Sequence, residues 1–237
     1  GINMSKKTAL ITGAGSGIGR ATAQKLANHG INLILIGRNL NKLEETKKLC
    51  DKVDIKCFSV DISHKEEIKT LFDHNLQFDY LINNAGVTMN KRFEEVTEEE
   101  YDQIMSINAK GPFFMCQSSL PILRKSESAT IINIGSVVAY KGYMDQSVYA
   151  SSKHALAGMT KALAKEVSND GIRVHLINPG GVLTDMVRQA RPDLPPDAND
   201  MIAPEDIADI IYFILSHRSN AIIDEINVHR RTKEPFL

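Results

Sequence analysis

The sequence has few cysteines. Its 237 residues include only Cys50, Cys57 and Cys116, and no two of them form a CxxC pair. An odd number of thiols without such spacing argues against a disulfide framework and against a cysteine-based zinc site. We therefore expect reduced thiols in a cytoplasmic protein.

The sequence also lacks an excess of charge of either sign. It carries 28 basic and 29 acidic residues, which gives a formal net charge of −1. Nucleic acids and anionic membranes favour a basic face, so this balance argues against both as main partners. We expect a small-molecule substrate as partner, with no nucleic acid and no membrane.

Long apolar runs are absent as well. Runs such as residues 31–37 and 129–134 have the length of a strand and are too short to span a bilayer. Residues 1–3 contain no basic segment followed by an apolar stretch, so we expect no secretory signal. They resemble a cloning remnant ahead of a natural start at Met4.

The sequence does contain a regular alternation of short β-rich runs and longer helical patterns. No linker or fixed-period repeat interrupts it, so we predict a single domain over residues 1–237. Several predicted strands are almost entirely apolar, as in parallel strands that are covered on both faces. The predicted strands lie at residues 8–12, 32–37, 54–60, 80–83, 130–135, 173–178 and 221–228. The predicted helices lie at residues 17–29, 40–49, 64–72, 98–123, 149–168 and 204–215. This order predicts an α/β fold, a doubly wound, Rossmann-like parallel sheet with helices on both faces.

Such sheets bind ligands at the carboxyl ends of their strands, which makes the strand-to-helix turns candidates for a site. The segment 184–203, beside the same edge, has a different character. It carries three prolines with Asp and Asn residues and is typical of an irregular excursion. Excursions of this length often act as lids, and we predict a substrate lid here.

The first of these turns is rich in glycine and reads Thr12-Gly13-Ala14-Gly15-Ser16-Gly17-Ile18-Gly19. Glycines bring backbone N–H groups close to a pyrophosphate, and the following helix adds its unpaired N–H groups and positive dipole end. Many structural turns match such a pattern, but this one follows a strand and opens an amphipathic helix. We therefore predict nucleotide binding, with phosphate contacts from Gly13, Gly15, Ser16, Gly17 and Gly19.

The end of the second predicted strand indicates which dinucleotide is bound. Enzymes that select NAD usually place Asp or Glu here to hold the ribose 2′-hydroxyl, and that carboxylate repels a 2′-phosphate. Here Gly37 is followed by Arg38, and Ser16 of the glycine turn adds no positive charge. Arg38 is either a solvated loop residue or the main 2′-phosphate contact. The missing acid together with the arginine favours NADP(H) over NAD(H).

Three motifs in this order resemble the short-chain dehydrogenase/reductase family. They are the TGxxxGxG turn, Asn83-Asn84-Ala85-Gly86 and Tyr149-Ala150-Ser151-Ser152-Lys153, within a similarity that runs from about Thr8 to Val228. Each motif is modest alone, and their order and spacing carry the resemblance. It implies an NADP(H)-dependent enzyme that transfers a hydride between nicotinamide and a carbonyl/alcohol pair.

The resemblance assigns catalysis to Asn108, Ser136, Tyr149 and Lys153. Tyr149 and Lys153 are four residues apart and so project from one helix face. A phenol titrates near pH 10, and an ammonium about 4 Å away is worth about 4 kcal/mol, enough to lower that pKa toward neutrality. Tyr149 would then act as acid in reduction and base in oxidation. Ser136 would orient the substrate oxygen, and Lys153 would also bond the nicotinamide ribose. Asn108 would support a water and proton path to the lysine, or simply kink its helix.

The same resemblance implies further cofactor contacts. Asp61 would bond the adenine amino group, or is simply an acid at a helix N-terminus. Asn84 would approach the ribose, Ile18 the pyrophosphate, and Val182 and Thr184 the carboxamide. The remaining implied contacts are Ile62, Ala85, Gly86, Tyr149, Pro179 and Gly180. Among the seven histidines there is no HExxH motif, so we predict no metal.

The chain departs from the family at its end. Many relatives finish with a glycine-rich segment, whereas this chain reads Asn227-Val228-His229-Arg230-Arg231. The substrate therefore stays open between a 3-oxoacyl thioester, a small hydroxy acid and a general carbonyl. A catalytically silent NADP(H)-binding sensor or regulator is the alternative, against which the intact Ser136, Tyr149 and Lys153 argue. Relatives pair the helices that correspond to residues 98–123 and 149–168, which implies a homodimer or homotetramer.

Overall fold

The computed structural model of the chain contains one sheet of seven strands in the order β3-β2-β1-β4-β5-β6-β7. It describes residues 7–184, 189, 192–193 and 200–236. Each neighbouring pair of strands is parallel. The strands are β1 (Thr8–Thr12), β2 (Asn32–Gly37), β3 (Ile55–Ser59), β4 (Tyr80–Asn83), β5 (Thr130–Ile134), β6 (Arg173–Pro179) and β7 (Glu225–Val228). The predicted doubly wound α/β fold is confirmed.

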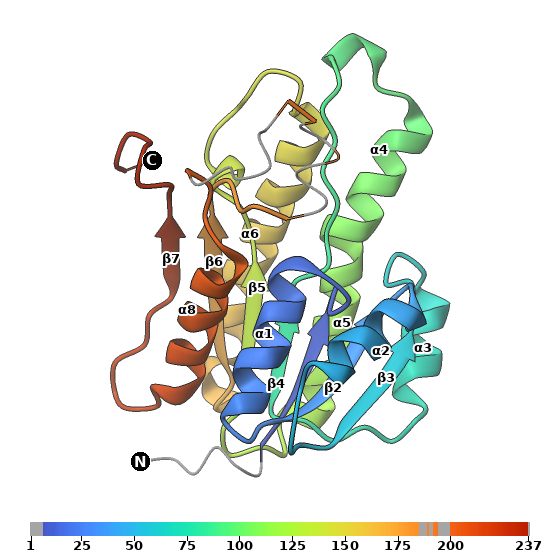
Figure 1. Cartoon of the computed structure of the whole chain (residues 1–237), viewed down its shortest axis with the longest axis vertical. Coiled ribbons are helices and arrows are strands. Elements are labelled where there is room, and N and C mark those ends of the chain that lie inside the picture. Colours follow the sequence, from blue (N-terminus) through green and yellow to red (C-terminus); the bar gives the residue numbers. More distant parts are fainter. Residues whose placement is uncertain (1–6, 185–188, 190–191, 194–199, 237) are drawn as a thin grey trace.

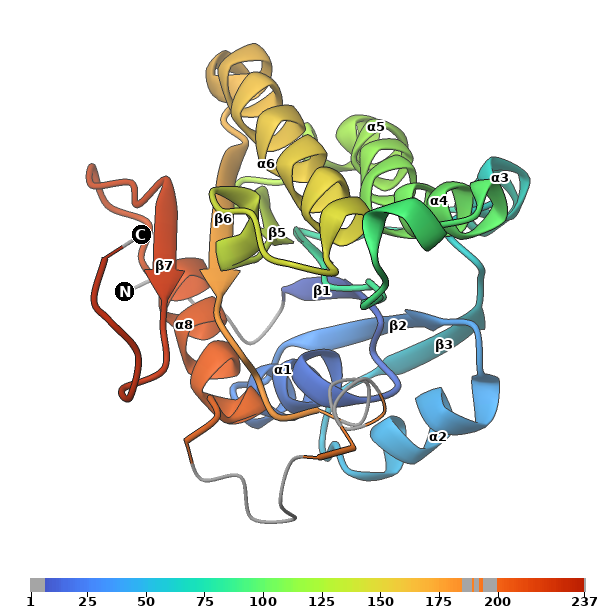
Figure 2. The same cartoon turned by 90° about the horizontal axis from the view of Figure 1, so that it is seen from above.

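Helices cover both faces of the sheet, as Figures 1 and 2 show. One face carries α1 (Gly17–Asn28), α2 (Leu40–Lys48) and α8 (Pro204–Ser216). The other face carries α3 (Lys65–Phe72), α4 (Glu98–Met105), α5 (Gly111–Leu123) and α6 (Ser147–Val167). Because helices cover both sides, every residue of β4 and β5 is buried, and apolar side chains occupy consecutive positions in them.

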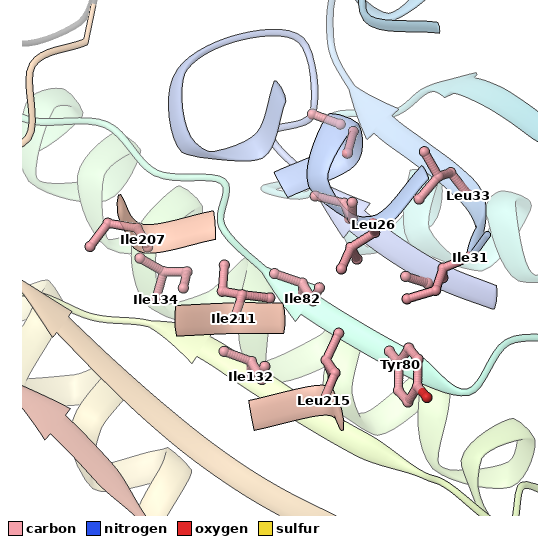
Figure 3. Packing of buried hydrophobic residues seen from close by; sticks show 14 of the residues in the cluster. Leu26, Ile31, Leu33, Tyr80, Ile82, Ile132, Ile134, Ile207, Ile211 and Leu215 are labelled. Atoms are coloured by element: carbon pink, nitrogen blue, oxygen red, sulfur yellow. The ribbon is translucent and has the colours of Figure 1, made fainter. Parts of the chain in front are cut away.

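A core lies on each face of the sheet. On the side of α1 and α8, Leu26 packs with Ile211 and Leu215 against Ile82 and Ile132 of the central strands (Figure 3). All five side chains are buried, and full burial of each contributes about 1.5–3 kcal/mol. A second cluster fills the opposite face beneath α3 and α5. The two cores hold the central strands rigidly and therefore fix where their carboxyl ends lie.

The order of the strands reverses between β1 and β4. After β1 the chain adds β2 and β3 on one side, and then returns to place β4 on the other side. The glycine turn follows β1 and the Asn84–Gly86 stretch follows β4. A doubly wound sheet forms its ligand crevice at such a reversal, so two of the predicted motifs meet there.

We had predicted one helical stretch over residues 98–123, and the structure divides it. A π-helical turn, η3 (Ser106–Lys110), separates α4 from α5. The apolar pattern could not show this turn, because it depends on contacts that Asn108 makes with other elements. Single π turns inside α-helices often occur at functional sites.

The last strand is shorter than the predicted 221–228. Upstream of Glu225, the carbonyls of Ser219 and Ala221 accept hydrogen bonds from the Arg173 guanidinium, and the Ile223 carbonyl bonds to His175 Nδ1. These carbonyls therefore bond to side chains and do not join the β-ladder.

Two further features concern the thiols and the lengths of the helices. The three cysteines are free thiols, and burial raises the pKa of Cys50 to about 11. Within the described stretches, no helix combines the length and the apolar character needed to cross a membrane.

Candidate functional site

The turns after β1 and β4 are bonded to each other. The Thr12 hydroxyl accepts hydrogen bonds from the backbone N–H groups of Asn84 and Ala85, both at 3.0 Å. In return, the Asn84 side chain donates to the carbonyls of Thr12 (3.3 Å) and Gly13 (3.2 Å). We had expected Asn84 near a ribose, and the structure shows its side chain holding the glycine turn.

The glycine turn leaves the start of α1 open to an anion. A Cβ on Gly19 would lie 2.1 Å from the Gly13 carbonyl oxygen, so the helix approaches the turn as closely as only glycine permits. Ser16 is the N-cap, and within the described part of the chain its side chain makes no capping hydrogen bond. The side chain of Ile18 packs against the core, so Ile18 can reach a pyrophosphate only through its backbone. The free N–H groups and the helix dipole provide the chemistry that binds phosphate.

A groove runs from this turn along the ends of β1, β2 and β4. The predicted residues that line it are Gly13, Gly15, Ser16, Arg38, Asp61, Ile62, Ala85 and Gly86. Sequence reasoning missed other lining residues, among them Asn39, Lys42, Val60 and Val87. The signal for Lys42 was present, because it is a second cation four residues after Arg38, in the first turn of the next helix.

At the α2 end, the groove meets a shallow hollow lined by Arg38, Asn39, Asn41, Lys42 and Ser59. The hollow therefore has two cations on its rim, and both are exposed. The Asn39 side chain caps α2 by accepting a hydrogen bond from the Lys42 N–H at 3.2 Å.

The position of α2 relative to the glycine turn is fixed by polar contacts. The Thr46 hydroxyl donates to the Ala14 carbonyl at 2.8 Å. Arg20, from α1, donates to the Thr46 hydroxyl at 2.9 Å and to the Lys42 carbonyl at 3.1 Å. These bonds hold the cations of the hollow beside the phosphate-binding turn.

Asp61, at the far wall of the groove, is an anion at neutral pH. Its partial burial raises the pKa, but two hydrogen bonds from Ser63 and the charges of His64 and Arg38 outweigh that effect and lower it overall. The Ser63 hydroxyl donates to Asp61 Oδ1 at 2.6 Å. The other carboxylate oxygen lies 3.7 Å from His64 Nε2.

Ser136 and Tyr149 meet where β5 and α6 approach each other. Ser136 caps a short 3-10 turn, η4 (Val137–Ala139), and its hydroxyl oxygen accepts from the Val138 N–H at 3.2 Å. Tyr149 lies in the first turn of α6 and its hydroxyl is within hydrogen-bond reach of Ser136. Burial raises the pKa of Tyr149, and the hydrogen bond with Ser136 offsets only part of that increase.

The predicted lowering of the Tyr149 pKa by Lys153 was therefore wrong for this structure. Lys153 Nζ donates to the Ile134 carbonyl at 3.2 Å and lies 5.9 Å from the centre of the Tyr149 ring. The lysine is buried, and burial lowers its own pKa to about 8. Spacing placed both side chains on one helix face, but burial disfavours both charged forms.

Asn108 lies in the π turn and joins three elements. Its amide nitrogen donates to the Val87 carbonyl (2.8 Å) and to the Ser152 hydroxyl (3.1 Å). Its amide oxygen accepts from the Val87 N–H at 2.8 Å. Ser152, which sequence reasoning missed, donates in turn to the Tyr149 carbonyl at 2.7 Å. Asn108 thus ties the loop after β4 to the helix that carries Tyr149 and Lys153.

The remaining predicted residues follow β6. Pro179 ends the strand, and the Gly180 N–H donates to the Val228 carbonyl at 2.6 Å. Val182 pairs with Ile202 in an isolated bridge, and the Thr184 methyl lies 3.1 Å from where a Cβ on Gly17 would be. The segment thus crosses from β6 to the start of α1. Most of the predicted lid at 184–203 lies outside the described residues.

The family model described as short chain dehydrogenase matches residues 7–195. The chain belongs to this family. An uncharacterized oxidoreductase of Staphylococcus epidermidis is 31% identical over 227 residues, which is 94% of this chain and 96% of the relative.

Two solved structures of family members are also similar. The 3-ketoacyl-(acyl-carrier-protein) reductase from Brucella melitensis, complexed with NADH, is 27% identical with a TM-score of 0.84, covering 94% of this chain and 96% of that one. A metagenomic short-chain oxidoreductase in complex with NADP is 27% identical with a TM-score of 0.83, covering 97% and 99%. The family assignment supports nucleotide binding and oxidoreductase chemistry, while these two relatives carry different cofactors.

Proposed function

We propose that the protein is an NADP(H)-dependent oxidoreductase that transfers a hydride between nicotinamide and a carbonyl/alcohol substrate, with Tyr149 as the acid/base. One observation carries the proposal. The Tyr149 hydroxyl lies within hydrogen-bond reach of Ser136, and the buried Lys153 lies one helical turn from the tyrosine. A nucleotide-binding protein without catalysis does not require this arrangement.

The groove fits a dinucleotide. The open N-terminus of α1 with Gly13, Gly15, Ser16 and Gly17 would hold the pyrophosphate. Asp61 and Ile62 would lie against the adenine, and Lys153 would bond the nicotinamide ribose. Val182 and Thr184 would close the carboxamide end. When it is bound, NADP(H) supplies or takes up the hydride.

Ser136, after β5, and Tyr149, on α6, would bind the substrate oxygen and transfer the proton. A substrate oxygen bound between Ser136 and Tyr149 would receive a hydrogen bond from each hydroxyl. The raised pKa of Tyr149 keeps the phenol protonated at neutral pH, so it is ready to donate its proton during reduction. Asn108 and Ser152 hold the loop after β4 and the helix that carries Tyr149 in place.

The preference for NADP(H) rests on the hollow beside α2. Arg38 and Lys42 provide two exposed cations where a carboxylate would repel a 2′-phosphate. A charge-assisted hydrogen bond of this kind contributes about 1.5–3 kcal/mol.

The proposed substrate is a carbonyl/alcohol compound: a 3-oxoacyl thioester, a small hydroxy acid or its oxo form, or a general carbonyl. NADPH consumption followed at 340 nm with a panel of these compounds tests the proposal. We expect turnover with NADPH and slower turnover with NADH. A catalytically silent sensor would bind NADPH, seen by its fluorescence, and consume none with any member of the panel.

We also propose that the protein forms a homodimer or homotetramer through α4–α5 and α6. Tyr101 and Phe113 expose 47% of their surface on the first of these helical segments. Sedimentation at micromolar concentration should show a particle of twice or four times the 26.3 kDa chain mass. A particle of the chain mass alone would contradict the proposal.

A further inference from the structure

The unusual end of the chain places a carboxylate beside the catalytic half of the sheet. Glu225 is the first residue of β7, and its Oε1 accepts a hydrogen bond from Asn178 Nδ2 at 2.7 Å. The same oxygen accepts a second hydrogen bond from the Tyr140 hydroxyl. One atom of β7 therefore binds two residues that are distant in sequence from it and from each other.

The first of these residues lies against the strand end that leads into Ser136. Asn178 is fully buried in β6, and the Gly135 N–H donates to the Ile177 carbonyl at 2.7 Å. A Cβ on Gly135 would lie 2.4 Å from Asn178 Oδ1, an oxygen without a hydrogen-bond partner among the described residues. The position of the Asn178 amide therefore limits where Gly135, and with it Ser136, can lie.

The second residue lies at the other side of Ser136. Tyr140 follows η4, and its N–H donates to the Val137 carbonyl at 3.3 Å. Within the same turn, the Ala139 N–H donates to the Ser136 carbonyl at 3.0 Å. Holding the Tyr140 ring therefore holds the turn that Ser136 caps.

We propose that Glu225 is a positioning residue for Ser136, because its carboxylate holds Tyr140 on one flank of the segment 135–140 and, together with Asn227 Oδ1 at 2.9 Å, holds Asn178 on the other. The inference rests on the proposed function, in which Ser136 bonds the substrate oxygen. Burial, and then the hydrogen bond to Glu225, raise the pKa of Tyr140 to about 12, so the phenol stays a donor across the working pH range. This arrangement does not include the glycine turn or the cations beside α2, so the phosphate contacts of the cofactor should not depend on it.

Kinetics of three variants test the inference. Glu225→Ala should lower kcat roughly 10- to 100-fold, as small displacements of catalytic groups do, with the Kd for NADPH changed less than about twofold. Glu225→Gln keeps one oxygen acceptor and should restore most of the activity. Asp224→Asn, at the exposed neighbouring position, is the matched control and should leave kcat unchanged. If Glu225→Ala does not fold, Tyr140→Phe removes one of the two bonds and should give a smaller loss of the same kind.

A double-mutant cycle with Ser136→Ala separates positioning from general structural support. If Glu225 acts through Ser136, then Glu225→Ala should lower the kcat of the Ser136→Ala protein by no more than about twofold. Losses that multiply in the double variant would overturn the inference.

Amide hydrogen exchange gives a readout that does not need turnover. In Glu225→Ala the N–H groups of Val138 and Ala139, which bond to Ser136, should exchange faster, while those of β1 keep their wild-type protection. Unchanged exchange at Val138 and Ala139 would overturn the inference. A wild-type protein that reduces no carbonyl would overturn the proposed function, and the exchange rates would still decide whether Glu225 positions Ser136.

Discussion

The two halves of the sheet build their parts of the site differently. Around β1 and β2 the groove is made from consecutive residues and from backbone groups, such as the glycine turn and the open start of α1. Around β5, β6 and β7 the candidate site depends on side chains from separate elements, such as Ser136 after β5, Tyr149 on α6 and Glu225 on β7. Binding of a common cofactor can thus rely on a local motif, whereas proton transfer relies on long-range alignment.

Removing the proton donor should separate the two halves most clearly. Tyr149→Phe should lower turnover about 10²- to 10⁴-fold, because general acid catalysis is lost. The affinity for NADPH should stay within about twofold, since the glycine turn and Arg38 are untouched. Tyr143→Phe, at an exposed position in the preceding loop, is the control. Near-native turnover of Tyr149→Phe would remove this residue from the mechanism.

Burial of Lys153 should appear in the pH dependence of stability. Its pKa is about 8 in the folded protein against 10.5 for a lysine in the unfolded chain, so between these values only the unfolded chain holds the proton. The free energy of unfolding of the cofactor-free protein, relative to Lys153→Met, should therefore rise with pH across this window, by about 3 kcal/mol in total.

Urea unfolding at several pH values between 7 and 10.5 measures this difference. Lys165→Met, an exposed position on the same helix, should show no such rise. If the difference in unfolding free energy between wild type and Lys153→Met does not change between about pH 8 and 10.5, the lysine is solvated.

The cofactor-binding part of the site is tested at Arg38, one of the two exposed cations beside α2. Arg38→Asp should weaken NADPH binding about 10- to 100-fold, while NADH binding changes little or improves through the free 2′-hydroxyl. The wild-type preference for NADPH should also fade with added salt, because Arg38 is exposed. The ratio of kcat/KM for the two cofactors measures both effects. Lys48→Asp, near the far end of α2, is the control. An equal change in the NADPH/NADH ratio of kcat/KM in both variants would show that Arg38 does not contact the 2′-phosphate.

The smallest effects compare two glycines in helices. Gly19→Ala should destabilise the fold by about 1–3 kcal/mol and weaken NADPH binding, because its Cβ would collide with the Gly13 carbonyl. Gly158→Ala, in α6, meets nothing within 4 Å and should stabilise the fold by up to about 1 kcal/mol. Thermal unfolding measures both changes in stability. Equal unfolding temperatures for the two variants would show that the turn does not require α1 to lie so close to the Gly13 carbonyl.

The part of the fold and site that is built from residues close together in the sequence could be predicted from it. The strands at 8–12, 32–37 and 80–83 begin and end where expected, because apolar runs between turn residues define them. The glycine turn was recognisable for the same reason, since its neighbours in sequence are its neighbours in space.

The remaining features of the site could not be predicted, because they depend on contacts between side chains and residues that are distant in the sequence. The π turn depends on bonds from Asn108 to Val87 and Ser152. Four-residue spacing placed Lys153 on the face of Tyr149, but its flexible stem carries Nζ to the Ile134 carbonyl. Glu225 reaches Asn178 only because β7 pairs with β6.

The transferred hydrogen itself can be followed most directly with labelled cofactor. NADPH that carries deuterium at both hydrogen positions of the reactive nicotinamide carbon is incubated with the protein and a carbonyl substrate, and the alcohol is analysed by mass spectrometry. We expect an alcohol that carries one deuterium at its carbinol carbon, and far less of this product from Tyr149→Phe. NADPH that binds while no labelled alcohol forms with any carbonyl tested would contradict hydride transfer by this protein.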